Sequence, residues 1–294
     1  DLHVRSRRQR QMCIRDSGRT IVTPMMSQYM EIKSDYSEAL LFYRMGDFYE
    51  LFFEDAKVAA SALDIALTKR GKHSGEDIPM CGVPHHSAEN YIYTLINKGF
   101  RVAICEQMES PEEAKKRGYK AVVRRAVVRL VTPGTLTEDT LLDAKKSNYL
   151  AAYSLVHGEA SVSWIDISTG SFYISSIKPE RLASELTRLS PSEILLSEDL
   201  AKIHRDLAEE FGISVTELGN SAFDSSSARE RLKKIFNVET VDGLGNFNRA
   251  ELSSMGAIIE YLQITQKGKL PLLSRPRREL NSSFMTIDLS LIHI

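Results

Sequence analysis

Apolar residues in the first 135 positions recur at spacings that predict a mixture of helices and strands. The run over 40–45 is apolar enough for a buried strand, and Gly46-Asp47 ends it with a turn signal. Thr23-Pro24 is an N-cap and first-turn pair, which predicts that a helix over 25–33 begins there. The other predictions are a helix over 55–63, a Gly- and Pro-rich loop over 71–84, a helix over 88–97 between a Ser87 cap and Gly99, and strands over 101–106 and 122–131.

In the remaining residues three strand-like runs come first, and helices alternate with strands afterwards. His157-Gly158 and Thr169-Gly170 separate the runs, as the turns of an antiparallel meander would. The predictions are strands over 149–156, 160–168 and 171–177, a helix over 179–189, a strand over 193–196, a helix over 200–211, a strand over 213–217, and helices over 228–236 and 249–266. The fold class expected for both parts of the chain is therefore α/β.

Composition bounds the size and class of the protein. The chain has 294 residues, of which 43% are hydrophobic and 26% charged, an ordinary globular composition long enough for two domains. No run of about 18 apolar residues occurs, so we expect no membrane-spanning helix. The net charge of −1 argues at first against a nucleic-acid partner, because such proteins usually carry a basic excess.

The distribution of charge along the chain changes this picture. Residues 20–135 hold 15 basic and 15 acidic side chains, whereas residues 136–260 hold 12 basic and 20 acidic ones. This asymmetry predicts a domain boundary near Thr132-Pro133-Gly134-Thr135. Between residues 115 and 129 seven bases occur with no acid, which indicates either a solvated face or a strip that follows a phosphate backbone.

The two ends of the chain differ in character from what lies between them. Residues 1–19 carry six basic side chains without the apolar segment of a secretory signal, and residues 289–294 are equally unlike the rest. We interpret both ends as non-native linker sequence. Three irregularly spaced cysteines, Cys13, Cys81 and Cys105, favour a reducing compartment over a disulfide scaffold, which predicts a cytoplasmic protein.

Motifs of enzymes and metal sites are absent or incomplete. The P-loop pattern G-x-x-x-x-G-K-[ST] does not occur in this stretch, and no catalytic residue is assigned. Cys81, His85 and His86 lie close together but match no standard zinc spacing, so no metal is expected there. Asp166, central on a predicted strand, leaves one alternative, a metal-dependent nuclease of ribonuclease H type. The further acids available to such a site are Glu159, Asp199 and Glu217.

A block rich in aromatic residues stands out from this background. Six aromatic side chains fall within thirteen residues around Gly46-Asp47. Alternation along the strand that follows places Phe48 and Glu50 on one face and Tyr49 and Leu51 on the other. Most of these aromatics belong in a core. A large aromatic beside a carboxylate is an unusual core pair, however, and it is suited to probing a nucleic-acid base.

At these residues the sequence resembles a known family. The blocks TPMMSQYMEIK, LLFYRMGDFYELFFEDA, LTKRG, IPMCGVPHHSAENYI, VAICEQ and VVRLVTPGT look like the amino-terminal part of the MutS family of DNA mismatch-recognition proteins. The similarity runs from about residue 23 to residue 288. It implies a mixed α/β mismatch-recognition domain over 20–135, a ribonuclease H-like α/β connector domain over 136–265, and the start of a core or lever domain over 266–288.

The resemblance also implies roles for individual residues. The family's Phe-x-Glu mismatch reader falls on Phe48 and Glu50, with the ring as a wedge at the mispaired base and the carboxylate as that base's hydrogen-bond partner. The charge of Glu50 would also penalise binding to intact duplex. The residues implied to approach the DNA backbone and minor groove are Lys69, Arg70, Pro79 and Met80. Arg124 and Arg125 are added from the basic strip alone.

Partners and cofactors follow from the same resemblance. It implies binding to mismatched double-stranded DNA, recruitment of MutL through the connector domain, and a homodimer for the complete family protein. The complete protein would be an ATPase that uses ATP and Mg²⁺, whereas for this stretch we expect neither a cofactor nor enzymatic activity. A cytoplasmic, nucleoid-associated location and no membrane partner are implied as well. Besides nuclease activity, a pure protein-interaction role is the remaining alternative to mismatch binding.

Overall fold

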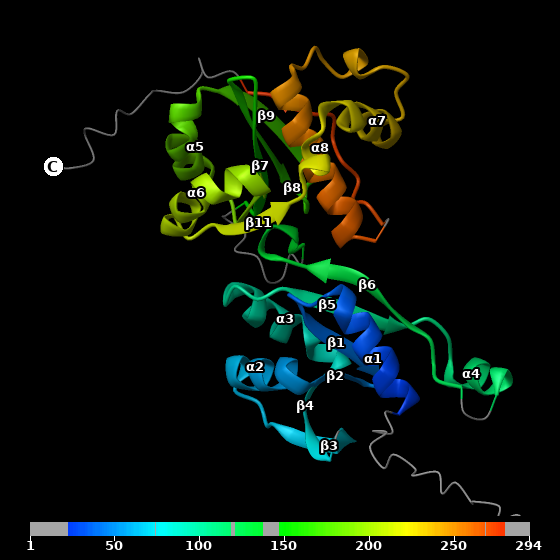
Figure 1. Cartoon of the computed structure of the whole chain (residues 1–294). Helices are drawn as coiled ribbons and strands as arrows, with labels where there is room; N and C mark the ends of the chain where they lie inside the picture. Colours follow the sequence, from blue (N-terminus) through cyan, green and yellow to red (C-terminus); the bar gives the residue numbers. More distant parts are fainter. Residues whose placement is uncertain (1–22, 74, 119–120, 138–146, 268, 280–294) are drawn as a thin grey trace, which may run out of the picture.

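The computed structural model describes residues 23–73, 75–118, 121–137, 147–267 and 269–279. These residues form two α/β units, each built on a six-stranded sheet with helices packed on it (Figure 1). The α/β class predicted from the sequence is therefore confirmed. The two ends interpreted as linker, residues 1–19 and 289–294, lie outside the described residues, and so do residues 280–288.

The first sheet places the strand that begins at Phe48 in its middle. The strand order is β3-β4-β2-β1-β5-β6, with β1 antiparallel to β2 and parallel to β5. The strands are β1 (Leu40–Met45), β2 (Phe48–Phe52), β3 (Thr68–His73), β4 (Glu76–Pro84), β5 (Val102–Gln107) and β6 (Arg125–Val131). Only Gly46 and Asp47 join β1 to β2, and this tight turn uses the left-handed conformation of Gly46 at φ 61°.

Helices cover both faces of this sheet, because successive side chains of a strand point to opposite sides. One face carries Leu41 and Tyr43 and packs against α1, whereas the other carries Leu40 and Phe42 and packs against α2 and α3. The helices of this unit are α1 (Pro24–Asp35), α2 (Phe53–Leu63), α3 (Ala88–Asn97) and α4 (Pro111–Arg117). The predicted N-cap of α1 is confirmed, since the Thr23 hydroxyl accepts a hydrogen bond from the Met26 amide at 3.3 Å.

Helix α4 protrudes from the rest of this unit (Figure 1). The Ser110 hydroxyl accepts from the Glu113 amide at 3.2 Å, and the Glu113 carboxylate accepts from the Ser110 amide at 2.8 Å. Together with Pro111 in the first turn, this capping box defines where the helix begins. No helix was predicted here, although Ser-x-x-Glu is the signature of such a start.

The second sheet has the order β11-β10-β7-β8-β9-β12. Its antiparallel meander confirms the three predicted strands, and β10 and β11 add to β7 in parallel. The strands are β7 (Tyr149–Val156), β8 (Glu159–Asp166), β9 (Ser171–Ile177), β10 (Glu193–Ser197), β11 (Ser214–Leu218) and β12 (Arg277–Arg278). Because β12 pairs with β9, residues assigned from the sequence to the start of a further domain extend this sheet.

Helices also cover both faces of the second sheet. The face with Ala151 and Trp164 packs against α5 and α6, and the face with Leu150 and Ile165 packs against α7 and α8. The helices are α5 (Leu182–Leu189), α6 (Glu198–Glu210), α7 (Ser225–Phe236) and α8 (Arg249–Thr265). Short 3₁₀ helices lie over His85–Ser87, Pro133–Thr135, Pro179–Arg181, Asn220–Phe223 and Val241–Gly243.

A buried carboxylate joins the two units. Glu193 on β10 has no exposed surface, and its Oε2 accepts hydrogen bonds from the Thr132 hydroxyl at 2.6 Å and the Gly134 amide at 2.9 Å. Its Oε1 accepts from the hydroxyls of Thr216 and Tyr261. Four donors therefore satisfy one carboxylate, two of them from the segment that leaves the first sheet.

Three local predictions were wrong. Residues 71–84, expected as a loop, lie largely in the β3–β4 hairpin, because Ile78, Cys81 and Val83 supply buried positions between the glycines and prolines. Ser87 makes no side-chain cap for α3, since its hydroxyl donates to the Pro84 carbonyl at the end of a 3₁₀ turn. The last strand of the first sheet begins at Arg125 rather than at residue 122.

Candidate nucleic-acid interface

Phe48 is a large aromatic side chain left exposed at the start of a central strand. It retains 46% of its surface, whereas Tyr49 retains 4% and Leu51 none. The alternation predicted from the sequence is thus confirmed, with Tyr49 and Leu51 in the core beneath α2 and α3. The Phe48 ring is therefore accessible to a partner, on the same face of the strand as Glu50.

The turn that carries Phe48 is anchored on both sides. The Tyr49 hydroxyl donates to Glu106 on β5, and Arg44 lies 5.5 Å from the Tyr49 ring centroid and 3.9 Å from the same carboxylate. Burial and the Glu106 carboxylate raise the pKa of Tyr49, so its hydroxyl stays a proton donor. The His85 amide donates to the Asp47 carbonyl at 2.8 Å. Phe48 therefore stands on a rigid support.

Glu50 forms an ion pair with Arg70. The Arg70 guanidinium lies 2.5 Å from Glu50 Oε2, and the two side chains are 43% and 14% exposed. Arg70 belongs to a stretch of β3 where the register with β4 shifts between Lys69 and Lys72. Such an irregularity re-aims a side chain away from the regular ladder. The structure therefore brings together two residues that the sequence placed in separate motifs.

Gly82 keeps the space beside Phe48 and Glu50 open. It pairs with Glu50 across the β2–β4 ladder and is exposed. A Cβ at this position would lie 3.8 Å from Glu50 Cγ and 3.9 Å from Phe48 Cδ1. Glycine within a strand often marks a site of close approach by a ligand. Gly82 was not among the predicted site residues, because residues 71–84 were expected to form a loop.

The other predicted contact residues of the hairpin lie on β3 and β4. Lys69 is exposed and pairs with Asp77 at 2.9 Å, an interaction that raises the pKa of Lys69 and lowers that of Asp77. Pro79 and Met80 are half-buried, and Met80 pairs with Phe52 on β2. These residues lie on strands at the same end of the sheet as Glu50. Their assignment to a DNA contact stays a prediction.

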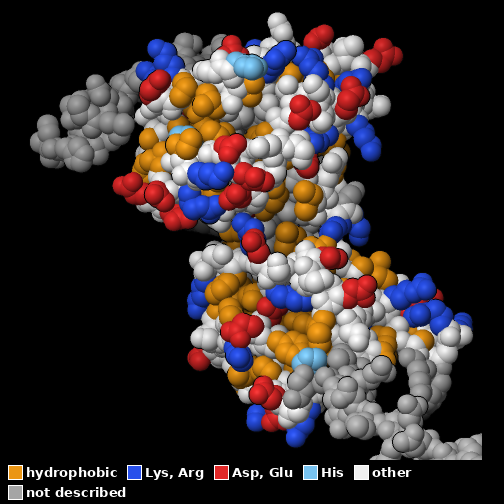
Figure 2. Space-filling model, viewed as in Figure 1, with side chains coloured by type: hydrophobic (Ala, Val, Ile, Leu, Met, Phe, Trp, Pro, Cys, Tyr) orange, Lys and Arg blue, Asp and Glu red, His pale blue; other side chains and the backbone are white. Residues whose placement is uncertain are grey.

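The described basic residues between positions 115 and 129 differ in their exposure and in their contacts. Arg125 is half-buried, donates to the Arg44 carbonyl at 2.8 Å, and stacks with its guanidinium 4.7 Å from the Tyr43 ring centroid. It therefore has a packing role as well as the predicted contact with phosphate. Arg124 is exposed. Figure 2 shows basic side chains gathered over α4, whose last turn contributes Lys115, Lys116 and Arg117.

The Asp166 carboxylate accepts hydrogen bonds within the turn that follows its strand. Its Oδ1 accepts from the Ser168 hydroxyl at 2.6 Å and from the Ser168 amide at 3.0 Å, as a turn-forming aspartate does. Among the described residues no group of three His, Cys, Asp or Glu side chains is placed to hold a metal ion.

The two cysteines of the first unit are buried, as a structural role requires. Burial raises the pKa of Cys81 to about 11 and that of Cys105 to about 12, so both thiols stay neutral at physiological pH. His85 lies against the Tyr49 ring, with ring centroids 5.5 Å apart. His85 therefore packs against a buried aromatic residue of β2.

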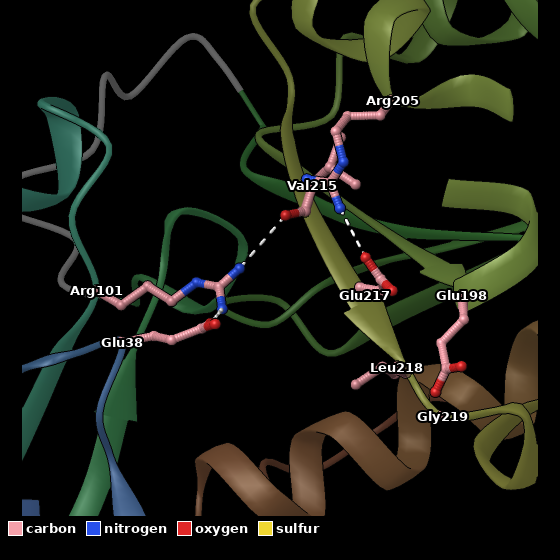
Figure 3. A pocket seen from close by; sticks show the side chains of 8 residues that line it. All are labelled: Glu38, Arg101, Glu198, Arg205, Val215, Glu217, Leu218 and Gly219. Atoms are coloured by element: carbon pink, nitrogen blue, oxygen red, sulfur yellow. Dashed lines mark hydrogen bonds and ion pairs between the residues drawn. The ribbon is translucent and has the colours of Figure 1, made fainter. Parts of the chain in front are cut away.

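A polar cleft of about 410 Å³ lies between the two units (Figure 3). Arg101 of the first unit reaches across it and donates to the Val215 carbonyl at 3.3 Å and the Thr216 hydroxyl at 2.8 Å. Arg205 and Glu217 pair at 2.8 Å on its other wall. Because Arg101 pairs with Glu38 and Arg205 with Glu217, we interpret this cleft as part of the contact between the units.

Comparison with known protein families divides the chain in the same two parts as the sheets. Residues 23–140 match MutS domain I, and residues 148–274 match MutS domain II. In the described part of the chain no helix is long and apolar enough to cross a membrane.

Curated relatives support the same assignment. The DNA mismatch repair protein MutS of Roseobacter denitrificans is 61% identical over 267 residues, which are 91% of this chain and 30% of that protein. MutS of Ruegeria pomeroyi is 62% identical over 270 residues, 92% of this chain and 31% of that protein. The chain therefore spans about a third of the length of these relatives.

Proposed function

The chain belongs to the MutS family of DNA mismatch repair proteins, and we propose that it binds mismatched duplex DNA by inserting Phe48 at the mispaired base. The exposure of Phe48 on a strand pair whose other aromatic residues are buried carries this proposal. Both matched domains and the relatives named for mismatch repair support a role in that process.

The physical basis of the proposed selectivity is the cost of deforming DNA. Opening a base step costs a few kcal/mol, less where the pair is already mismatched, and stacking an aromatic ring on the exposed base returns about 1–3 kcal/mol. A ring held by a rigid turn loses little conformational entropy when it inserts. The protein therefore selects deformable sites, and the mispair is the most deformable step in a duplex.

Glu50 complements the ring in this proposal. Its carboxylate accepts a hydrogen bond from the displaced base, a contact that an intact pair does not offer. Near phosphates the same charge weakens binding to matched duplex. Lys69, Arg124 and the basic face of α4 would contact the backbone and set register without reading sequence.

Wider roles are proposed for the complete family protein. We propose that it is a homodimeric ATPase that uses ATP and Mg²⁺, and that the second unit of this chain contacts MutL. In this proposal the chain itself binds DNA and catalyses no reaction. The nuclease alternative is disfavoured by the turn-capping role of Asp166.

The test compares binding to a mismatched and a matched duplex of the same length. Phe48→Ala should lower the preference for the mismatched duplex by about tenfold to hundredfold, because it removes one base-stacking contact. Phe211→Ala is the matched control, since Phe211 is 42% exposed but lies in the second unit. Fluorescence anisotropy of labelled duplexes, with the complete protein that carries this chain, measures the preference. An unchanged preference in Phe48→Ala removes the wedge assignment.

A further inference from the structure

The ion pair between Glu50 and Arg70 connects two residues of the proposed interface. We propose that Arg70 is a positioning residue that acts through Glu50: it stays paired with the carboxylate when DNA binds, orients it and offsets part of its charge there. This role differs from that of an independent phosphate contact. The inference rests on the proposed function, because it concerns the same binding surface.

The geometry of the pair leaves room for a base. Arg70 binds Glu50 through Oε2, and a carboxylate has two oxygens with several acceptor positions. Oε1 can therefore accept a hydrogen bond from a displaced base while Oε2 remains with Arg70. The guanidinium also restricts the rotation of the carboxylate, which orients Oε1 before DNA arrives.

The environment explains why the pair would persist. Glu50 is already 14% exposed, and a docked duplex would exclude most of the remaining water. Charges attract more strongly when water is excluded, and a carboxylate left without its partner at a dry interface is costly. Loss of Arg70 should therefore weaken DNA binding chiefly through the stranded charge of Glu50.

Lys69 provides a matched control on the same strand. It carries the same charge as Arg70, and it pairs with Asp77 rather than with Glu50. If the strand acts only as a source of positive charge, Lys69 and Arg70 should respond alike to a change at Glu50. If Arg70 acts through Glu50, only Arg70 should depend on that carboxylate.

A double-mutant cycle with Arg70→Gln and Glu50→Gln tests the proposal on a mismatched duplex. The proteins are the complete protein that carries this chain and its variants. We expect Arg70→Gln to lower affinity about tenfold when residue 50 is Glu and about twofold when it is Gln, a coupling of about fivefold. Lys69→Gln should lower affinity by the same factor in both backgrounds. Circular dichroism and thermal melting confirm that each variant is folded.

Each other outcome overturns the proposal in a defined way. Equal losses from Arg70→Gln in both backgrounds would identify Arg70 as an independent phosphate contact. A larger loss with Gln at position 50 would show that the pair breaks on binding and releases Arg70 to the DNA. Failure of the proposed function is distinguishable, since the wild-type protein would then show no preference for mismatched over matched duplex.

Discussion

At the scale of single residues, the proposed interface contains three positions where the fold does not require the residue that is present. Phe48 is exposed beside two core residues, Glu50 is satisfied by Arg70, and Gly82 has no conformational reason to be glycine. At each of these positions a residue more typical of strands would contribute more to the stability of the fold. Positions that break a local rule without structural benefit are where function is expected.

Gly82 provides a prediction at this scale. Gly82→Val should raise the free energy of unfolding by up to about 1 kcal/mol, because valine suits a strand better than glycine. The same change should lower affinity for mismatched duplex by about tenfold, since the side chain occupies the space beside Phe48 and Glu50.

Gly82→Ala is the smaller step in the same direction, because its Cβ would make ordinary contacts of 3.5 Å or more. Its effect on affinity should fall between those of glycine and valine. Urea unfolding and anisotropy measure the two quantities. Equal affinity in all three proteins would show that no part of the DNA approaches Gly82.

At the scale of elements, the sequence predicted most of the regular core and missed the β3–β4 hairpin and helix α4. The β1 strand and the β7–β9 meander were predictable because apolar runs and turn residues agree there. The β3–β4 hairpin was not, because glycines and prolines obscure the spacing of its few buried residues. Helix α4 was missed although its capping signature is local.

The candidate site was predictable only in part for a related reason. Alternation along one strand placed Phe48 and Glu50 on the same face, because this relation is local. The pairing of Glu50 with Arg70 joins residues 20 positions apart across three strands and depends on an irregular register in β3. Tertiary contacts of this kind are not encoded in the spacing of a single element.

At the scale of the whole molecule, hydrogen bonds made by side chains and backbone groups connect the two units. The hydrogen bonds to Glu193 and the reach of Arg101 tie the end of the first sheet to β10 and β11. Gly134 is required there, since a Cβ would lie 2.8 Å from Glu193 Cβ. The carboxylate and its donors thus form a specific connection between the units.

Glu193 provides a prediction at this scale. Glu193→Ala should lower the free energy of unfolding by about 3 kcal/mol, because it leaves buried donors without an acceptor. Glu193→Gln retains the shape and one acceptor oxygen, so it should cost about half as much. Urea unfolding followed by circular dichroism measures both. A loss below about 1 kcal/mol for the alanine variant would show that the network contributes little.

The central claim is that Phe48 enters the duplex at the mispaired base, and the contact itself can be measured. A photoreactive p-benzoylphenylalanine in place of Phe48 cross-links to the nucleotides it touches, which primer extension then identifies. We predict cross-links at the mispaired base or its direct neighbour, with at least about tenfold lower yield on the matched duplex. Cross-links spread evenly along both duplexes, or none at the mismatch, would contradict the account.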